Sequence, residues 1–327
     1  MKLIQNKKAQ AEESINWVFV LMAGAVILLF FAMIIYRFGI VSEKQTDVTI
    51  VTNLNSILAG TELSSRFSTL IEDLPNDKEA YFDCNGFTIG GSTNSYQQKI
   101  VFAPSQLPLN PLRIWTLDWN MPYLVTNFVY LTSRKIQYVF VHDENSPLKS
   151  RIESIIPEDM NKLFLTDTSR TFNNCPTRYV FLDKDPVSLQ DICATSTAVR
   201  INSDGTISYY SKNGNSFILE GQSNYFDDAS LQAAIIADNA VYYECMMNKA
   251  FKRYKSVSYI IAERTLSLKN DPQLVQCNSH YNTDAEDLYR IVASGNFKTA
   301  FNEIKSLMTS IIGTNRQLPL YSCPTIY

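Results

Sequence analysis

The most prominent feature of the hydropathy pattern is one uninterrupted uncharged run near the start of the chain. Residues 14–36 contain no charged side chain, and they follow a short basic leader, MKLIQNKK. A helix of about 23 residues is roughly 34 Å long, which exceeds the roughly 30 Å of a bilayer's hydrocarbon core. The run therefore predicts a transmembrane anchor over residues 10–40. Residues representative of this anchor are Ile15, Trp17, Gly24, Phe30 and Tyr36.

Two other interpretations of the run remain open. A buried helix of a globular domain is one, although such helices seldom stay apolar on every face for this length. A cleaved secretory signal is the other, but its apolar region normally spans about 7–15 residues and ends in an A-x-A-like site. The run here is longer, and the segment Tyr36-Arg37-Phe38-Gly39 is a poor cleavage site. We therefore expect the anchor to stay attached.

Charges and cysteines together predict which side of the membrane the chain occupies. Three lysines precede the run, whereas Arg37 and Lys44 follow it, and this bias favours a cytoplasmic N-terminus. All the cysteines lie after the anchor, and an even number is typical of an oxidising compartment. They are Cys84, Cys175, Cys193, Cys245, Cys277 and Cys323. We expect a single-pass protein of the cell membrane with an extracytoplasmic C-terminal domain; six buried thiols in a cytosolic domain are the alternative.

The sequence leaves the cysteine pairing open, because six cysteines allow 15 connectivities. Cys175 and Cys193 flank an apolar segment and could close one loop, and Cys245 could reach either Cys277 or Cys323. No CxxC pair and no His/Cys cluster at zinc-ligand spacing occurs, so we expect no metal site.

Beyond the anchor, the periodicity predicts a mixed α/β head between helical segments, an α+β fold class overall. Apolar residues over 41–74 recur at helical spacing, whereas 79–141 alternate as strands with a hairpin turn at Asn85-Gly86. The next segment contains an apolar strand, then a helix beginning at Ser146-Pro147, then two further apolar strands. This order predicts that these strands pair locally in parallel. A helical pair over 229–269 and 283–313 follows. The predicted parts are a cytoplasmic leader (1–9), the anchor (10–40), a neck (41–75), the head (76–228) and a helical part with an extended tail (229–327).

Few residues in the chain are candidates for catalysis. His142, Asp143 and Glu144 follow an apolar strand, where α/β proteins commonly bind ligands. The segment Ser146–Lys149 matches S-x-x-K but lacks the companion elements of that motif, so a helix start explains it better. No P-loop, GxSxG, HExxH or GxGxxG motif occurs. The pattern favours a non-enzymatic protein without a cofactor; a membrane-anchored enzyme or ligand-binding receptor with a site near His142–Glu144 is the alternative.

The charge distribution excludes one class of partner. The formal net charge of −3 provides no basic footprint for nucleic acid. A local basic cluster, Lys249, Lys252, Arg253 and Lys255, lies on the first C-terminal helix. We expect it to form a solvated face, with an acidic partner or anionic head groups as the alternative.

The residues next to the apolar run suggest a family. Lys7-Lys8-Ala9-Gln10-Ala11-Glu12-Glu13 resembles the class III signal of archaeal type IV pilin-like surface proteins. The resemblance covers about residues 1–40 and implies cleavage between Ala9 and Gln10. It further implies a retained helix that serves both as an anchor in the lipid bilayer and as the interface with other pilin-like subunits. In bacterial pilins the fifth residue after the cut is usually acidic, whereas here it is Ser14. The resemblance implies an extracytoplasmic structural or interaction protein.

Overall fold

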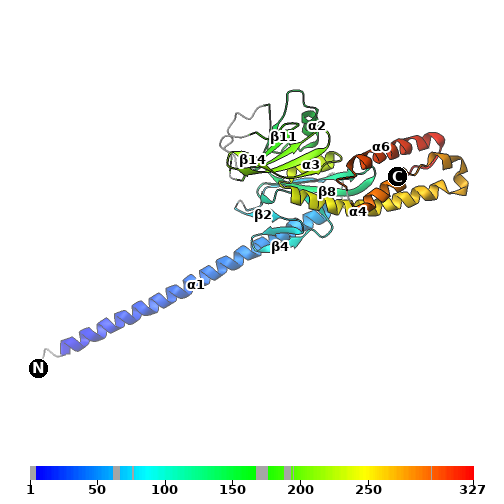
Figure 1. The fold of residues 1–327 in the computed structure, drawn as a ribbon. Helices are drawn as coiled ribbons and strands as arrows, with labels where there is room; N and C mark the ends of the chain where they lie inside the picture. Colours follow the sequence, from blue (N-terminus) through cyan, green and yellow to red (C-terminus); the bar gives the residue numbers. More distant parts are fainter. Residues whose placement is uncertain are drawn as a thin grey trace.

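The computed structural model combines a long projecting helix, a head of sheets and helices, and a C-terminal helical lobe (Figure 1). It describes residues 5–61, 67–75, 77–166, 176–187, 193, 195–295 and 297–327. Within the first helix, side chains are described for residues 21–34, for residue 36 and from residue 44 onward. The mixed α/β composition expected of the head is confirmed.

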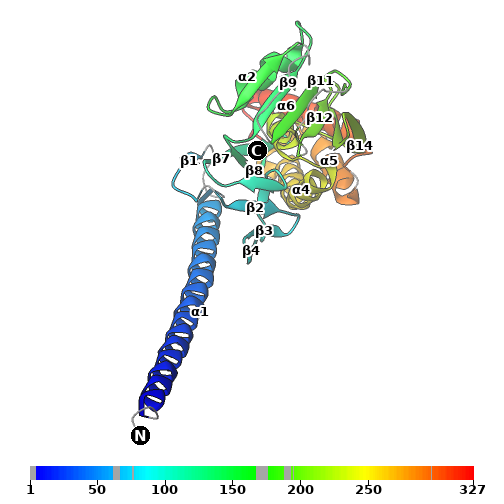
Figure 2. The same ribbon diagram turned by 90° about the vertical axis from the view of Figure 1, so that its left-hand side faces the viewer.

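The first helix, α1 (Gln5–Thr61), is continuous over 57 residues, which corresponds to roughly 85 Å. Figures 1 and 2 show it leaving the head as a straight rod, and only its last turns contact the head. Ile50, Val51, Leu54 and Leu58 are buried there, at the helical spacing predicted for the neck. The helix ends earlier than predicted. Residues predicted to continue it form β1 (Ser68–Ile71), because they pair antiparallel with β7 (Leu112–Asn120).

The predicted transmembrane anchor over residues 10–40 is wrong. No helix in the described part of the chain combines the length and the apolar character that crossing a bilayer requires. The predicted location in a cell membrane with the C-terminal domain outside depended on this anchor, and the same finding overturns it.

The described strands form three sheets. The central sheet has the order β1-β7-β8-β5, and β5 lies parallel to β8 while the other pairs are antiparallel. Its remaining strands are β5 (Ile100–Phe102) and β8 (Leu124–Ser133). Trp115 and Trp119 of β7 are both buried, and they stack on Tyr130 and Phe128 of β8 respectively.

A small antiparallel sheet, here called the hairpin sheet, has the order β4-β3-β2-β6. It consists of β2 (Glu79–Phe82), β3 (Gly86–Ile89), β4 (Ser92–Ser95) and β6 (Gln106–Pro108). The predicted hairpin is confirmed: the Asp83 carboxylate accepts hydrogen bonds from the main-chain N–H groups of Asn85 and Gly86 and closes the turn. This sheet lies beside the last turns of α1 (Figure 2).

The six-stranded sheet has the order β10-β9-β11-β12-β13-β14. Its strands are β9 (Gln137–Val141), β10 (Lys162–Leu165), β11 (Thr177–Leu182), β12 (Thr197–Ile201), β13 (Thr206–Asn213) and β14 (Ser216–Asn224). The parallel pairing predicted for the apolar strands is confirmed for β9, β10 and β11, and β12 also pairs parallel with β11. The helix α2 (Pro147–Ile155) connects β9 to β10 and begins after Ser146, as predicted.

A buried helix, α3 (Asp228–Ile236), joins the central and six-stranded sheets. The Trp115 indole donates to Gln232 Oε1 at 2.9 Å, and the Tyr130 hydroxyl donates to the Ala229 carbonyl at 2.8 Å. On the other side of α3, Arg178 of β11 donates hydrogen bonds to main-chain carbonyls at the C-terminal end of α3. Eight of the nine α3 residues are buried, which fits its place inside the core.

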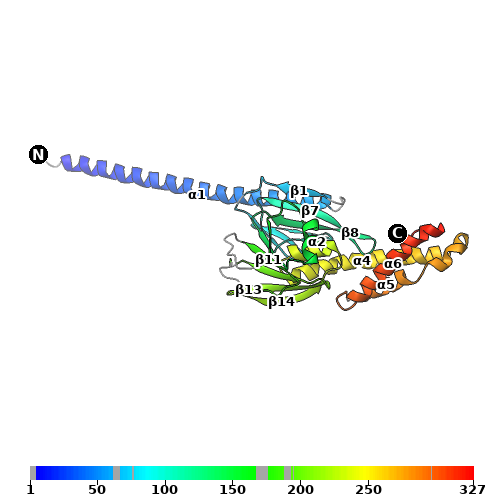
Figure 3. The same cartoon turned by 90° about the horizontal axis from the view of Figure 1, so that it is seen from above.

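The C-terminal lobe extends from the head in the direction away from α1 (Figure 3). It contains α4 (Ala240–Lys269), η1 (Pro272–His280), α5 (Asp284–Ser294), α6 (Phe301–Gln317) and η2 (Leu318–Tyr321). The predicted helical pair is therefore too simple. The first predicted helix divides into α3 and α4 because the Asn239 side chain caps a new helix, and the second divides where Gly295 ends α5 at φ +83°.

Candidate functional sites

The apolar segment of α1 is the most exposed hydrophobic surface among the described residues. Its large apolar side chains are between 56% and 72% exposed. They are Leu21, Met22, Val26, Ile27, Leu28, Leu29, Phe30, Phe31, Met33 and Tyr36. Residues 26–31 are consecutive, so at 100° per residue they surround the helix completely. An exposed apolar surface of this size is typical of interaction sites. Gly24, Phe30 and Tyr36 of the predicted anchor belong to this surface, whereas the side chains of Ile15 and Trp17 lie outside the described residues.

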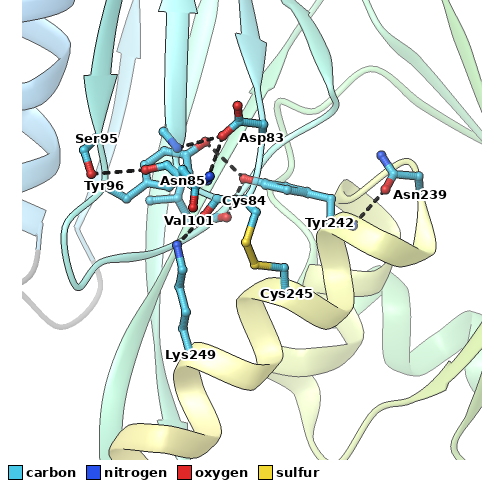
Figure 4. The surroundings of a disulfide bond; sticks show 11 residues. Asp83, Cys84, Asn85, Ser95, Tyr96, Val101, Asn239, Tyr242, Cys245 and Lys249 are labelled. Atoms are coloured by element: carbon cyan, nitrogen blue, oxygen red, sulfur yellow. Dashed lines mark hydrogen bonds between the residues drawn. A yellow bond between two sulfur atoms is a disulfide. The ribbon is translucent and has the colours of Figure 1, made fainter.

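A disulfide between Cys84 and Cys245 fastens the hairpin sheet to α4 (Figure 4). The Cα atoms of the two cysteines are 5.8 Å apart. Beside it, Lys249 donates to the Cys84 carbonyl and lies over the Tyr96 ring, 5.5 Å from its centroid. The Tyr242 hydroxyl donates to the Val101 carbonyl at 2.7 Å. These contacts hold the turn between β2 and β3 rigidly against the helix.

The other cysteines correct the predicted pairing. Cys277 pairs with Cys323 at a Cα separation of 5.7 Å, so Cys245 pairs with neither of them. This bridge holds the C-terminal tail against η1 in a small core with Tyr281, Leu318 and Ile326. Cys193 is disulfide-bonded, and Cys175, its predicted partner, lies outside the described residues.

The basic cluster of α4 does not form one solvated face. Lys249 and Arg253 turn toward the head, and the Arg253 guanidinium donates to Thr126 Oγ1 at 2.5 Å. Lys252 and Lys255 are exposed. Half of the cluster therefore stabilises the contact between α4 and the strands.

The residues of the alternative site near His142 do not converge on a cavity in the described geometry. His142 is buried, with Nδ1 2.8 Å from the Asp143 carbonyl oxygen, and its ring packs near Phe164. The Asp143 carboxylate forms an exposed ion pair with Lys184 at 2.7 Å, and Glu144 is exposed. Over the described residues, no group of three or more His, Cys, Asp or Glu side chains is placed to hold a metal ion.

A cavity of about 340 Å³ lies at the opposite ends of the same parallel strands. One wall is a row of three register partners on adjacent strands: Tyr138 of β9, Arg178 of β11 and Thr197 of β12. The facing wall comes from the hairpin sheet and includes Glu79 and Gln106. The cavity therefore lies between two sheets and beside the amino ends of the parallel strands.

Arg178 is held by the end of α3. It is 3% exposed and forms four hydrogen bonds to main-chain carbonyls of Ala234, Ile235, Ala237 and Asp238. A cation is favourable there because the C-terminal end of a helix carries partial negative charge. Burial lowers the pKa of the Arg178 guanidinium, and the nearby Asp238 carboxylate opposes that shift. The positive charge is thus compensated within the protein.

Two carboxylates on the cavity wall are held in fixed positions. Asp238 accepts hydrogen bonds from the Ser105 main-chain N–H at 2.8 Å and from the Ser105 hydroxyl at 2.5 Å. Glu79 accepts from the Gln106 amide at 2.5 Å and from the Tyr81 hydroxyl at 3.3 Å. The sequence pattern does not predict this site. Arg178 within the apolar strand RYVFLD is the one signal for it, because a charged residue is seldom fully buried without a partner.

Comparison with known proteins identifies no relative of this chain. No family model, no curated protein and no solved structure matches it.

Proposed function

We propose that this protein is a non-enzymatic assembly or interaction protein of type IV pilin-like character, in which α1 of one copy packs against α1 of other copies. The observation that carries the proposal is the apolar segment of α1, which surrounds a helix that projects from the head. Burial of a single large aliphatic or aromatic side chain stabilises a contact by about 1.5–3 kcal/mol. The ten large apolar side chains exposed on α1 therefore strongly favour association between helices.

The attachment of α1 to the head supports the same function. Four buried apolar residues and an ion pair between Asp47 and Lys78 hold the last turns of the helix on the hairpin sheet. Because α1 is one continuous helix, its apolar segment and the head move as a single unit. A subunit of this form places its head at a fixed position along an assembly.

The class III signal resemblance adds a processing step to the proposal. Cleavage between Ala9 and Gln10 removes the basic leader and begins the mature chain just before the apolar run. The intact mass of the protein isolated from its native cells tests this step. Loss of residues 1–9 supports it, and a full-length chain contradicts it.

A cysteine scan tests the association of α1. Each residue of 21–33 is replaced in turn by cysteine in the full chain, which is purified in mild detergent and oxidised at high dilution. No cysteine is free among the residues that the structure describes, so the added thiol reports on contacts between copies. Leu124→Cys on the exposed surface of the head is the matched control.

The pattern of covalent dimers decides the outcome. A defined helix-to-helix interface gives dimers at spacings of three and four residues, because such positions share one helix face. Equal yields at all positions indicate non-specific adhesion, and absence of dimers indicates no contact. Either of these two results overturns the proposal.

A further inference from the structure

The cavity between the hairpin sheet and the six-stranded sheet has the properties of a ligand site, independently of assembly through α1. Its volume of about 340 Å³ falls within the range of roughly 300–1,000 Å³ that small-molecule sites occupy. Strands of both sheets and the loops next to them form its walls, and the disulfide between Cys84 and Cys245 fixes the hairpin sheet against α4. The cavity is therefore formed in advance of any ligand.

The charges around the cavity disfavour an anionic ligand. Arg178 is the cation on its wall, but four carbonyls at the negative end of α3 and the nearby Asp238 already compensate its charge. Glu79 and Asp238 add two carboxylates to the same walls. A phosphate or carboxylate group would be repelled by both of them.

The hydrogen-bonding groups of the walls favour a ligand rich in hydroxyl groups. Ionised carboxylates only accept hydrogen bonds, whereas the hydroxyls of Thr195 and Thr197 both donate and accept, as does the Gln106 amide. A ligand that satisfies all of them must donate and accept through several adjacent groups. Neutral hydroxyl groups do both, whereas an ammonium group only donates.

Apolar wall residues complete the match. Pro104, Pro108, Ile136 and Tyr138 are among the residues that line the cavity. A sugar ring presents C–H groups on its faces and hydroxyl groups at its edge, so it contacts apolar and polar walls at once. We propose that this cavity binds a small neutral saccharide, with Glu79 and Thr197 among the residues that hydrogen-bond its hydroxyl groups.

Isothermal titration of the full chain tests the proposal with a panel of free neutral sugars. The panel comprises hexoses, deoxyhexoses, pentoses and N-acetylhexosamines, with putrescine and inorganic phosphate as the cationic and anionic probes. The variants are Glu79→Gln and Thr197→Val, each of which removes hydrogen-bonding capacity at nearly constant size. Glu153→Gln makes the same carboxylate-to-amide change on α2 and is the control.

We expect saturable binding of at least one sugar in the millimolar range or tighter. Each wall variant should weaken it about ten-fold, because the substitution removes one group that hydrogen-bonds the sugar, while the control leaves it unchanged. Circular dichroism and thermal unfolding of each variant separate loss of the site from loss of the fold. Failure of every sugar to bind overturns the proposal, and so does binding of putrescine or phosphate alone or sugar binding that both wall variants retain.

Discussion

The Asp47 carboxylate of α1 lies 3.0 Å from the Lys78 ammonium group, and both side chains are largely buried, at 6% and 14% exposure. This ion pair joins the projecting helix to the chain segment that enters β2. Buried apolar residues of α1, among them Leu54 and Leu58, form another part of the attachment. Removing Asp47 takes a close, opposite charge away from Lys78 in a mostly dry contact.

Replacement of Asp47 by alanine should therefore weaken the head and the attachment of α1 together. Breaking a buried ion pair by removing one partner costs about 3–5 kcal/mol, and the partial exposure of Lys78 brings the expected loss to about 2–3 kcal/mol. Chemical unfolding measures it. Glu286→Ala, which breaks an exposed pair with Arg290, is the control and should cost less than about 1 kcal/mol. Equal losses in the two variants would contradict the structural role of Asp47.

Gly90 tests the same junction from the opposite side. It has a φ of +56°, and a Cβ atom added to it would meet the Asp47 carboxylate at 2.0 Å. Gly90→Ala should therefore lower the free energy of unfolding by both backbone strain and displacement of Asp47. Gly214 is the matched control, because its φ is +61° and nothing lies within 4 Å of the added atom. Backbone strain alone costs about 1–2 kcal/mol.

Thermal unfolding of the two glycine variants separates the effect of the clash with Asp47 from the effect of backbone strain. Gly90→Ala should be destabilised by at least about 1 kcal/mol more than Gly214→Ala, an amount comparable to overpacking of a core. If the two variants lose the same free energy of unfolding, a clash between the added Cβ atom and Asp47 does not contribute to the loss.

The local elements of the fold could be predicted from the sequence because short-range chemistry determines them. The Asp83 carboxylate closes the hairpin turn through the neighbouring Asn85 and Gly86, and Ser146-Pro147 begins a helix because proline fits the first turn. The run at Phe67, Leu70 and Ile71 shows the limit of periodicity. Its spacing fits a helix, yet pairing with β7 makes it a strand, so tertiary contact overrides the local pattern.

The cavity and the disulfide between Cys84 and Cys245 could not be predicted in this way. The two cysteines are separated by 161 residues, and nothing in their neighbourhoods indicates the partner. Likewise Glu79 and Arg178 come to one cavity only because two sheets pack together. His142 follows the carboxyl end of β9, where α/β proteins commonly bind ligands, whereas this cavity lies at the amino ends of the parallel strands.

Asp227 gives the head a pH dependence that stability measurements can detect. Burial raises the pKa of this carboxyl to about 6, and hydrogen bonds from Ser230 oppose the shift. Because the folded pKa lies above the unfolded value of about 3.9, the folded state binds more protons between these two pH values. Stability should therefore fall as pH rises from about 4 to about 6. The carboxylate keeps some contact with water, so we expect a fall of about 1 kcal/mol rather than the roughly 3 kcal/mol of the full shift.

Asp227→Asn isolates this effect, because asparagine caps a helix as well as aspartate does but does not titrate. Urea unfolding of both proteins between pH 4 and pH 6.5 gives the difference in stability at each pH. The variant should gain stability relative to the parent as pH rises. A difference that stays constant across this range would show that Asp227 titrates alike in the folded and unfolded chains.

The two described disulfides should contribute to different parts of the molecule. The bridge between Cys84 and Cys245 joins the hairpin sheet to α4, so its removal by a double serine substitution should destabilise the head by about 2–4 kcal/mol. The bridge between Cys277 and Cys323 closes a shorter loop of 46 residues within the lobe. Its removal should release the C-terminal tail first, because the small core around Tyr281 is a cluster separate from the main core of the head.

Peptide mapping without reductant and hydrogen exchange test these assignments together. The map should contain peptides that join Cys84 to Cys245 and Cys277 to Cys323. In the variant that lacks the second bridge, faster exchange should be confined to η1, η2 and the residues after Cys323, while the strands of the head keep their protection. A peptide that joins Cys245 to either lobe cysteine would contradict the structure. Exchange that rises equally throughout the head would mean that lobe and head unfold as one cooperative unit, so that the tail bridge stabilises both.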